Sequence, residues 1–275
     1  MDLKELLEKR LPERELQFLK GAFDVIGEVA IIEIPEELSH RERDIVDALL
    51  DMHPRLKTIY SKGSERKGVY RLRELKLIYG EEKETEHKEH GYRIRLDVSK
   101  VFFSPREANE RQRIARLVRP RENVMVMFAG AGPYSIAIAK HQPKVGKVFS
   151  VEINPDAYKY MIENVRINKA GDKVVPVLGD VDDVCTPYFG KCDRVVMPLP
   201  KGAYEYIKLA AKCLKKGGGV IHYYFLSSPD ALDEIKEIVS VDIQSVGRKV
   251  KAVKTAKVSE YAPKTLKFCM DIRVK

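Results

Sequence analysis

The sequence has no tryptophan, only four cysteines and no apolar run of the roughly eighteen residues that a membrane-spanning helix needs. The cysteines show no C-x-x-C spacing, and the six histidines are scattered, so we expect reduced structural thiols and no metal site. The amino terminus, MDLKELLEKRLPEREL, is charged and is therefore not a signal peptide. These absences predict a cytoplasmic protein without a bound metal.

Positive charge is abundant, because 50 lysines and arginines outnumber 41 acidic residues and give a net charge of +9. In a chain of this kind the excess favours a polyanionic partner such as nucleic acid, although a basic surface that serves only solubility is the alternative. The runs Arg66-Lys67 and Arg71-Leu72-Arg73 are candidates for phosphate contacts.

The first hundred residues alternate between short helical and strand-like patterns. We expect helices over residues 3–20 and 40–53, and strands over residues 24–35, 69–81 and 92–98. The charged stretch GEEKETEHKEHG between the last two strands is predicted to be a loop or hairpin turn. Residues 1–100 therefore form a small α+β domain in this prediction.

Residues 101–275 have a different sequence pattern, in which predicted apolar strands and helices alternate regularly. This alternation is typical of a doubly wound parallel sheet. The final segment, residues 264–275, is expected to pair with residues 251–261 as an antiparallel edge. The strands are predicted at about 124–128, 147–153, 173–178, 193–197 and 219–225, with helices at 133–141, 155–168, 203–215 and 229–239.

A glycine turn, FAGAG, joins the first of these strands to its helix. Gly130 and Gly132 permit a tight turn and a close approach of the backbone to a ligand. Ser135 replaces the third glycine of a dinucleotide fingerprint, and no Gly-Lys-Ser/Thr follows, so neither a nicotinamide site nor a nucleotide-triphosphatase loop is indicated. Glu152 and Asp180 follow the next two strands, where acids bind a ribose and an adenine amino group, unless they are only strand-end and loop acids.

The segment SPRE at residues 104–107 has the pattern of a capping box, with Ser104 as the N-cap of a helix. On that helix Arg106 and Glu110 have the spacing of an i,i+4 ion pair. A capped helix start is compatible with function, because its N–H groups favour an anion.

Five stretches together resemble a known family: KVFFSPREANERQRI, FAGAGPYSIAIAK, VEINPDAYKYMIENVRINK, LGDVDDV and DRVVMPLP. They are similar to the class I, Rossmann-like S-adenosylmethionine-binding core, and more narrowly to enzymes that modify guanosine 37 of tRNA. One branch of this family is formed by the archaeal and eukaryotic tRNA (guanine37-N1)-methyltransferases. The other is formed by the wybutosine-synthesizing 3-amino-3-carboxypropyl transferases. The resemblance implies S-adenosylmethionine as co-substrate and the anticodon loop of tRNA as partner. No metal is expected, and the sequence leaves the oligomeric state open, with a monomer favoured.

The resemblance also implies roles for individual residues. Glu110 matches the proposed base of the methyltransferase branch, and Arg71 matches an arginine used beside it. Phe102, Phe103 and Tyr134 are aromatic side chains for stacking on a base, or alternatively core residues. Val126 stands where related loops carry an aspartate, so a contact from that acid is lost. The missing aspartate and the basic net charge favour the alternative hypothesis, a non-catalytic RNA-binding protein that keeps the methyltransferase fold. The cofactor contacts implied are Ser104, Arg111, Phe128, Gly130, Gly132, Glu152, Asp180, Val181 and Pro198.

Two features favour aminocarboxypropyl transfer over methyl transfer. Pro198 stands where the methyltransferase branch has an asparagine, and proline offers no polar side chain and no N–H. The sequence also leaves no room before Asp24 for the additional small domain that the methyltransferase branch usually carries. The favoured reaction is transfer to C7 of the tricyclic 4-demethylwyosine at position 37 of tRNA-Phe, releasing methylthioadenosine; guanine-N1 methylation is the alternative.

Overall fold

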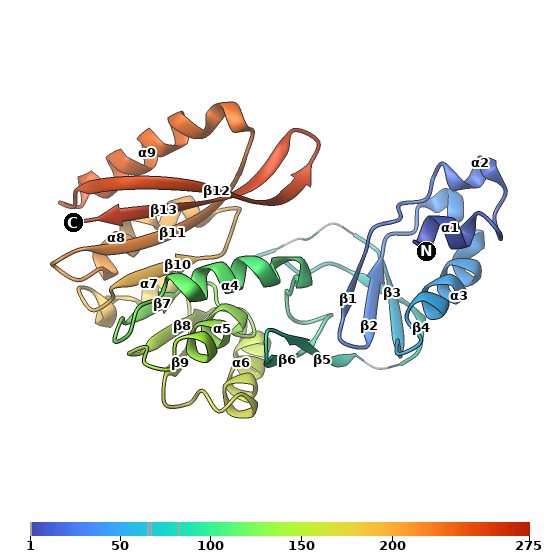
Figure 1. Ribbon diagram of the computed structural model, residues 1–275, viewed down its shortest axis with the longest axis horizontal. Helices are drawn as coiled ribbons and strands as arrows, with labels where there is room; N and C mark the ends of the chain where they lie inside the picture. Colours follow the sequence, from blue (N-terminus) through green and yellow to red (C-terminus); the bar gives the residue numbers. More distant parts are fainter. Residues whose placement is uncertain (1, 65, 67, 82) are drawn as a thin grey trace. The chain divides into compact units, whose positions relative to one another are not determined.

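The computed structural model describes residues 2–64, 66, 68–81 and 83–275 (Figure 1). It divides into two compact units, the first ending at Arg106 and the second running from Glu107 to Lys275. Within the described residues no helix is both long and apolar enough to span a bilayer.

In the first unit, short helices pack on a mixed sheet with the strand order β1-β2-β3-β4. Its principal helix buries Ile45, Ala48 and Leu49, which recur at helical spacing and face the apolar cluster. The helices are α1 (Leu3–Leu7), α2 (Glu13–Leu16) and α3 (Glu42–Met52), and the strands are β1 (Phe23–Ile26), β2 (Val29–Ile32), β3 (Thr58–Lys62) and β4 (Leu75–Tyr79).

Two predicted elements of this unit are each divided in the structure. The single helix expected over residues 3–20 is broken, because Pro12 is extended at the N-cap of α2 and disfavours helix in the residue before it. The single strand expected over residues 24–35 turns back at Gly27, whose φ of +59° suits glycine, so β1 and β2 form an antiparallel hairpin.

The charged stretch predicted as a loop contains a strand, β5 (Glu84–Glu89), which pairs with β6 (Tyr92–Asp97). Thr85 connects this strand to the end of β1, because its side chain is 6% exposed and its hydroxyl donates to the carbonyl oxygen of Ile26 at 3.0 Å. The strand predicted over residues 69–81 is shorter than expected, since only its second half forms β4 and Arg71 lies in a turn.

The second unit confirms the predicted doubly wound sheet, with strand order β12-β13-β11-β10-β7-β8-β9 (Figure 1). Strands β11, β10, β7, β8 and β9 are mutually parallel, whereas β13 runs antiparallel to β11 and carries the antiparallel edge strand β12, as predicted. The strands are β7 (Val124–Val126), β8 (Val148–Glu152), β9 (Val174–Leu178), β10 (Arg194–Met197), β11 (Gly219–Ser227), β12 (Val250–Ala262) and β13 (Thr265–Val274). The helices are α4 (Ala108–Leu117), α5 (Pro133–His141), α6 (Pro155–Ile167), α7 (Val181–Val184), α8 (Ile207–Cys213) and α9 (Leu232–Ser245).

Strand β11 separates two different environments. Ile221, Tyr223 and Phe225 belong to the apolar cluster that also contains residues of α8 and α9. His222 and Tyr224 alternate with them and therefore face the opposite side. On that side Tyr224 meets α4 through Glu110, so a strand of the core carries polar groups directly beneath this helix.

The cysteines lie within the second unit and are buried, free thiols. Burial raises the pKa of Cys192 to about 12 and that of Cys269 well above its usual value, so both thiols stay protonated and unreactive at neutral pH.

Candidate active site

The glycine turn after β7 departs from ordinary backbone geometry. Phe128, Gly130 and Gly132 all have positive φ, at +58°, +59° and +84°. Gly132 is the N-cap of α5, and a Cβ there would lie 3.0 Å from Cγ of Met161. The turn therefore needs glycine at this position and brings its backbone N–H groups to the carboxyl end of β7.

Glu152, at the end of β8, is tied directly to this turn. The backbone N–H of Gly130 donates to its Oε2 at 2.6 Å, and that of Asn154 donates to Oε1 at 2.8 Å. The side chain is 8% exposed, and burial raises its pKa although these N–H groups oppose the shift. Because a carboxylate accepts about four hydrogen bonds, Glu152 can hold the turn and a ligand hydroxyl together.

Asp180 follows β9 and is half-buried. Its side chain is the N-cap of α7, accepting from the backbone N–H of Asp182 at 3.0 Å, a structural role that the sequence analysis did not assign. The backbone N–H of neighbouring Gly179 donates to the carbonyl of Glu152 at 3.0 Å, so the ends of β8 and β9 are joined. Val181, directly after it, is 3% exposed.

Phe128 and Pro198 line the same edge of the sheet. The ring of Phe128 is half-buried and meets Tyr206 edge-on, with the centroids 5.2 Å apart. Pro198 is half-buried where the chain leaves β10, in a turn closed by the N–H of Leu199 on the carbonyl of Met197.

Asn164 is a residue of this site that the sequence analysis missed. It is completely buried in α6, and its Nδ2 donates to the carbonyl of Ala131 at 3.1 Å. This hydrogen bond holds the glycine turn against α6. An asparagine within a helical pattern gives no sign of such a partner, which lies 33 positions away.

Of the residues predicted in the first unit, Arg71 has a φ of +54° and its guanidinium carbon lies 5.4 Å from the ring centroid of Phe102. Arg66 lies over the same ring at 4.2 Å. Arg71 and Arg73 line one cavity with Phe102. Phe103 is 6% exposed and packs against His87, so it is a core residue. Lys67 lies outside the described residues.

The helix after Ser104 begins later than the capping box predicts. Pro105–Glu107 forms a 3₁₀ turn, and α4 starts at Ala108 with Glu107 in the cap position. Arg106 donates to Asp24 at 2.5 Å, so the predicted Arg106–Glu110 pair does not form. The competing bond to Asp24 accounts for the missing ion pair.

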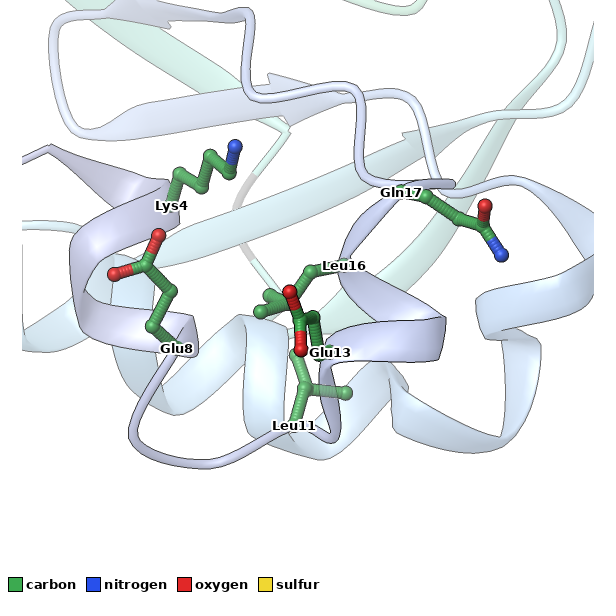
Figure 2. A pocket seen from close by; sticks show the side chains of 6 residues that line it. All are labelled: Lys4, Glu8, Leu11, Glu13, Leu16 and Gln17. Carbon is green, nitrogen blue, oxygen red and sulfur yellow. The ribbon is translucent and has the colours of Figure 1, made fainter.

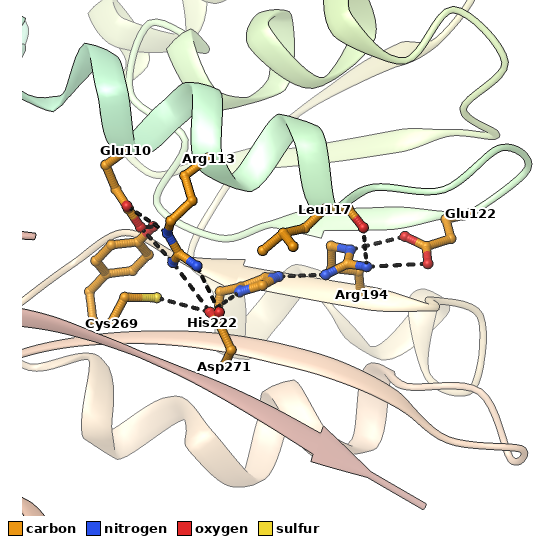
Figure 3. Close-up of polar contacts among 9 residues, drawn as sticks. Glu110, Arg113, Leu117, Glu122, Arg194, His222, Cys269 and Asp271 are labelled. Carbon is orange, nitrogen blue, oxygen red and sulfur yellow. Dashed lines mark hydrogen bonds and ion pairs between the residues drawn. The ribbon is translucent and has the colours of Figure 1, made fainter. Parts of the chain in front are cut away.

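Glu110 instead pairs with Arg113, one turn along α4 (Figure 3). Nε and Nη2 of Arg113 donate to its two carboxylate oxygens, each at 2.8 Å, and the hydroxyl of Tyr224 donates to Oε1 at 2.5 Å. Arg111, beside it, is 2% exposed. Tyr134 is also buried, at 4% exposure, and its ring meets that of Tyr224 in an edge-to-face contact with the centroids 6.0 Å apart.

Arg113 continues into a second set of buried charges that the sequence analysis did not foresee. Its Nη1 donates to Asp271 at 2.7 Å, and Asp271 in turn contacts His222. His222, Cys269 and Asp271 have ligand atoms within 4.8 Å of one another, the spacing of a metal site. However, Arg194 lies 2.6 Å from Nε2 of His222 and Arg113 is bound to Asp271, and two guanidinium groups disfavour a cation there.

A separate hollow of about 450 Å³ lies in the first unit between α1 and α2 (Figure 2). Its lining mixes charges of both signs with two leucines, and it contains none of the predicted site residues. The lining residues are Lys4, Glu8, Leu11, Glu13, Leu16 and Gln17.

Comparison with known proteins places this geometry in a family. A model of the TRM5/TYW2 methyltransferase domain matches residues 85–255, and a model of the TYW2 N-terminal domain matches residues 3–83. The chain is 43% identical to tRNA (guanine(37)-N(1))-methyltransferase Trm5b of Pyrococcus abyssi, over 96% of this chain and 78% of the relative. It is 30% identical to the tRNA(Phe) (4-demethylwyosine(37)-C(7)) aminocarboxypropyltransferase of Pyrococcus horikoshii, over 99% of this chain and 96% of the relative.

Solved structures agree with these matches. The crystal structure of Trm5b from Pyrococcus abyssi superposes with a TM-score of 0.86 at 42% identity, covering 96% of this chain and 78% of that one. P. horikoshii TYW2 in complex with MeSAdo superposes with a TM-score of 0.82 at 30% identity, covering 99% and 97%. S-adenosylmethionine is thus the co-substrate, and the buried Glu152 and the glycine turn suit it. The chain belongs to the TRM5/TYW2 family of S-adenosylmethionine-dependent tRNA-modifying transferases.

Proposed function

We propose that this chain transfers the methyl group of S-adenosylmethionine to N1 of guanosine 37 in tRNA. The observation that carries the proposal is the 43% identity, over 96% of the chain, to a relative named for that reaction. Identity to relatives named for aminocarboxypropyl transfer is lower, at 30% for that of Pyrococcus horikoshii and 33% for that of Methanocaldococcus jannaschii. Methyl transfer, the alternative in the sequence analysis, is therefore proposed ahead of aminocarboxypropyl transfer, which Pro198 favours.

The proposed binding site for the co-substrate lies at the carboxyl ends of β7, β8, β9 and β10. Glu152 accepts from the ribose hydroxyls and Asp180 from the adenine amino group. The methionine end is assigned to Ser104 and Arg111. Phe128, Val181 and Pro198 contribute apolar contacts, and Gly130 and Gly132 allow the backbone to approach.

In the reaction the sulfonium offers a methyl carbon to in-line attack by guanine N1. The N1–methyl bond forms as the sulfur–methyl bond breaks, and the N1 proton passes to the carboxylate of Glu110, leaving S-adenosylhomocysteine. Support for Glu110 as the base is its position in the motif SPREANER and its bidentate contact with Arg113, which keeps the carboxylate oriented. Arg71 is assigned to the substrate base or its phosphate.

The two domains divide the task in this proposal. Residues 1–100 position the RNA, and residues 101–275 hold the co-substrate. Arg66, Arg71 and Arg73 gather in the first unit around Phe102, as a surface for a phosphate backbone requires.

Aminocarboxypropyl transfer is the second candidate. It is favoured by the match of residues 3–83 to the TYW2 N-terminal domain and by Pro198, which presents an apolar surface suited to a tricyclic base. Attack at the γ-carbon of the methionine arm would then leave methylthioadenosine.

The by-product separates the two reactions. The full chain is incubated with S-adenosylmethionine and either tRNA with unmodified guanosine 37 or tRNA carrying the tricyclic precursor. We expect S-adenosylhomocysteine with the first tRNA. Methylthioadenosine formed only with the second would refute methyl transfer and establish the alternative.

A further inference from the structure

A continuous chain of charged side chains runs beneath α4, from Glu110 to Glu122 (Figure 3). It links α4 to β13 through Asp271, to β11 through His222 and to β10 through Arg194. Each of these groups is at least two-thirds buried. Side-chain exposures are 8% for Glu110, 30% for Arg113, 20% for Asp271, 0% for His222, 5% for Arg194 and 15% for Glu122.

Each guanidinium group in this series of side chains pairs with at least one carboxylate, the imidazole of His222 connects the two ion-paired groups, and the bonds are short. Nε and Nη2 of Arg113 donate to the carboxylate of Glu110, while Nη1 and Nη2 donate to Asp271 at 2.7 and 3.3 Å. Asp271 also lies 2.5 Å from Nδ1 of His222. Arg113 is therefore held between two carboxylates, one on its own helix and one on β13, so its fork has a single orientation.

The contacts of His222 determine which of its nitrogens carries the proton. Nη1 of Arg194 lies 2.6 Å from Nε2, and because a guanidinium only donates, Nε2 must be the acceptor. Nδ1 then carries the hydrogen and donates to Asp271. Burial lowers the pKa of His222, which agrees with a neutral ring. At its far end Arg194 is fixed by Glu122 at 2.9 Å and by the carbonyl of Leu117 at 2.8 Å.

We propose that Asp271 and His222 are positioning residues that, through Arg113, fix the carboxylate of Glu110 for proton removal. The inference rests on the proposed function, in which Glu110 is the base. Neither residue touches the substrate. They act by holding the guanidinium of Arg113 in one orientation, which in turn holds the carboxylate of Glu110 in one orientation. Because a reacting group must be held to within a fraction of an ångström, a loss of this restraint lowers the rate of the chemical step and leaves substrate binding unchanged.

The test compares two variants, each of which removes the charge of one buried carboxylate in this series of hydrogen-bonded side chains. Asp271→Asn places an amide between Arg113 and His222, where only Arg113 separates it from Glu110. The matched control, Glu122→Gln, places an amide at the far end, against Arg194. We expect both to lower the melting temperature, but only Asp271→Asn to lower kcat, by about 10- to 100-fold with KM and S-adenosylmethionine affinity unchanged. The tRNA used is whichever of the two gives product.

Two results would overturn the proposal: equal effects of the two variants on kcat, or a folded Asp271→Asn variant with the wild-type kcat. The buried series of side chains would then contribute to stability alone. If Asp271→Asn does not fold, Arg113→Lys replaces it: the lysine keeps the charge but not the fork, and kcat must still fall. Glu110→Gln distinguishes the two hypotheses. A wild-type kcat in Glu110→Gln refutes the base role itself, whereas a low kcat there beside a normal Asp271→Asn refutes only the positioning role.

Discussion

At the scale of single residues, the proposed co-substrate site depends on backbone geometry and on one buried carboxylate. The glycine turn and the place of Glu152 at the end of the second strand could be predicted from sequence because both are local features: a positive φ favours glycine, and an acid after the second strand faces the turn after the first. Asn164 could not, because its partner Ala131 is brought to it only by the fold.

Replacing Gly132 by alanine is expected to destabilise the second unit. Alanine at a φ of +84° is strained, and its Cβ would press against Met161. We expect the free energy of unfolding, measured with denaturant, to fall by more than about 1 kcal/mol. Gly171→Ala is the control, because nothing lies closer than 3.9 Å to its Cβ and no positive φ is imposed there. Equal stability of the two variants would show that the turn is not constrained.

Glu152→Ala is expected to weaken S-adenosylmethionine binding. Loss of a charge-assisted hydrogen bond costs about 1.5–3 kcal/mol, or roughly 10- to 150-fold in affinity. Calorimetry measures the change, and the exposed Glu237→Ala on α9 serves as control. An unchanged affinity in Glu152→Ala removes the ribose assignment.

At the scale of elements, most of the parallel strands could be predicted because their apolar runs are buried on both faces, although β9 is only partly buried. Helix α9 was predicted to end at residue 239 but continues to Ser245. Strand β5 could not be predicted, since four of its six residues are charged and only Thr85 and the pairing with β6 reveal it. The ion pair of Arg113 with Asp271 was equally hidden, because 158 positions separate the partners.

This pair makes the contact of α4 with β13 sensitive to acid. Burial alone would raise the pKa of Asp271, but the bonds from His222 and Arg113 outweigh it and hold the pKa well below the usual 3.8. A lowered pKa means that the contribution to stability is present above 3.8 and is lost as the pH falls through the folded-state value.

Denaturant unfolding of the wild type and of Asp271→Asn across pH measures this contribution. The difference in free energy should be about 3–5 kcal/mol near neutral pH, as for breaking a buried pair, and should shrink below about pH 4. A difference that is independent of pH would contradict the ionic role of Asp271.

At the scale of the whole molecule, the net charge of +9 and the family both point to tRNA. Phosphate contacts release counterions, so the logarithm of tRNA affinity should fall linearly with the logarithm of salt concentration. Arg73→Ala should reduce that slope by about 1, as expected for one lost phosphate contact. The control is Lys236→Ala on α9, an exposed lysine outside the proposed surface. Equal slopes for Arg73→Ala and the wild type would exclude this arginine from the interface.

In the proposed reaction the methyl group of S-adenosylmethionine, rather than its aminocarboxypropyl group, is transferred to the tRNA. The most direct measurement supplies S-adenosylmethionine labelled with one isotope in the methyl carbon and another in the carboxyl carbon, together with tRNA carrying guanosine 37. The nucleoside at position 37 is then isolated and analysed by mass spectrometry. We predict N1-methylguanosine bearing the methyl label alone. No labelled nucleoside from this tRNA, with the carboxyl label found instead in tRNA carrying the tricyclic precursor, would contradict the claim.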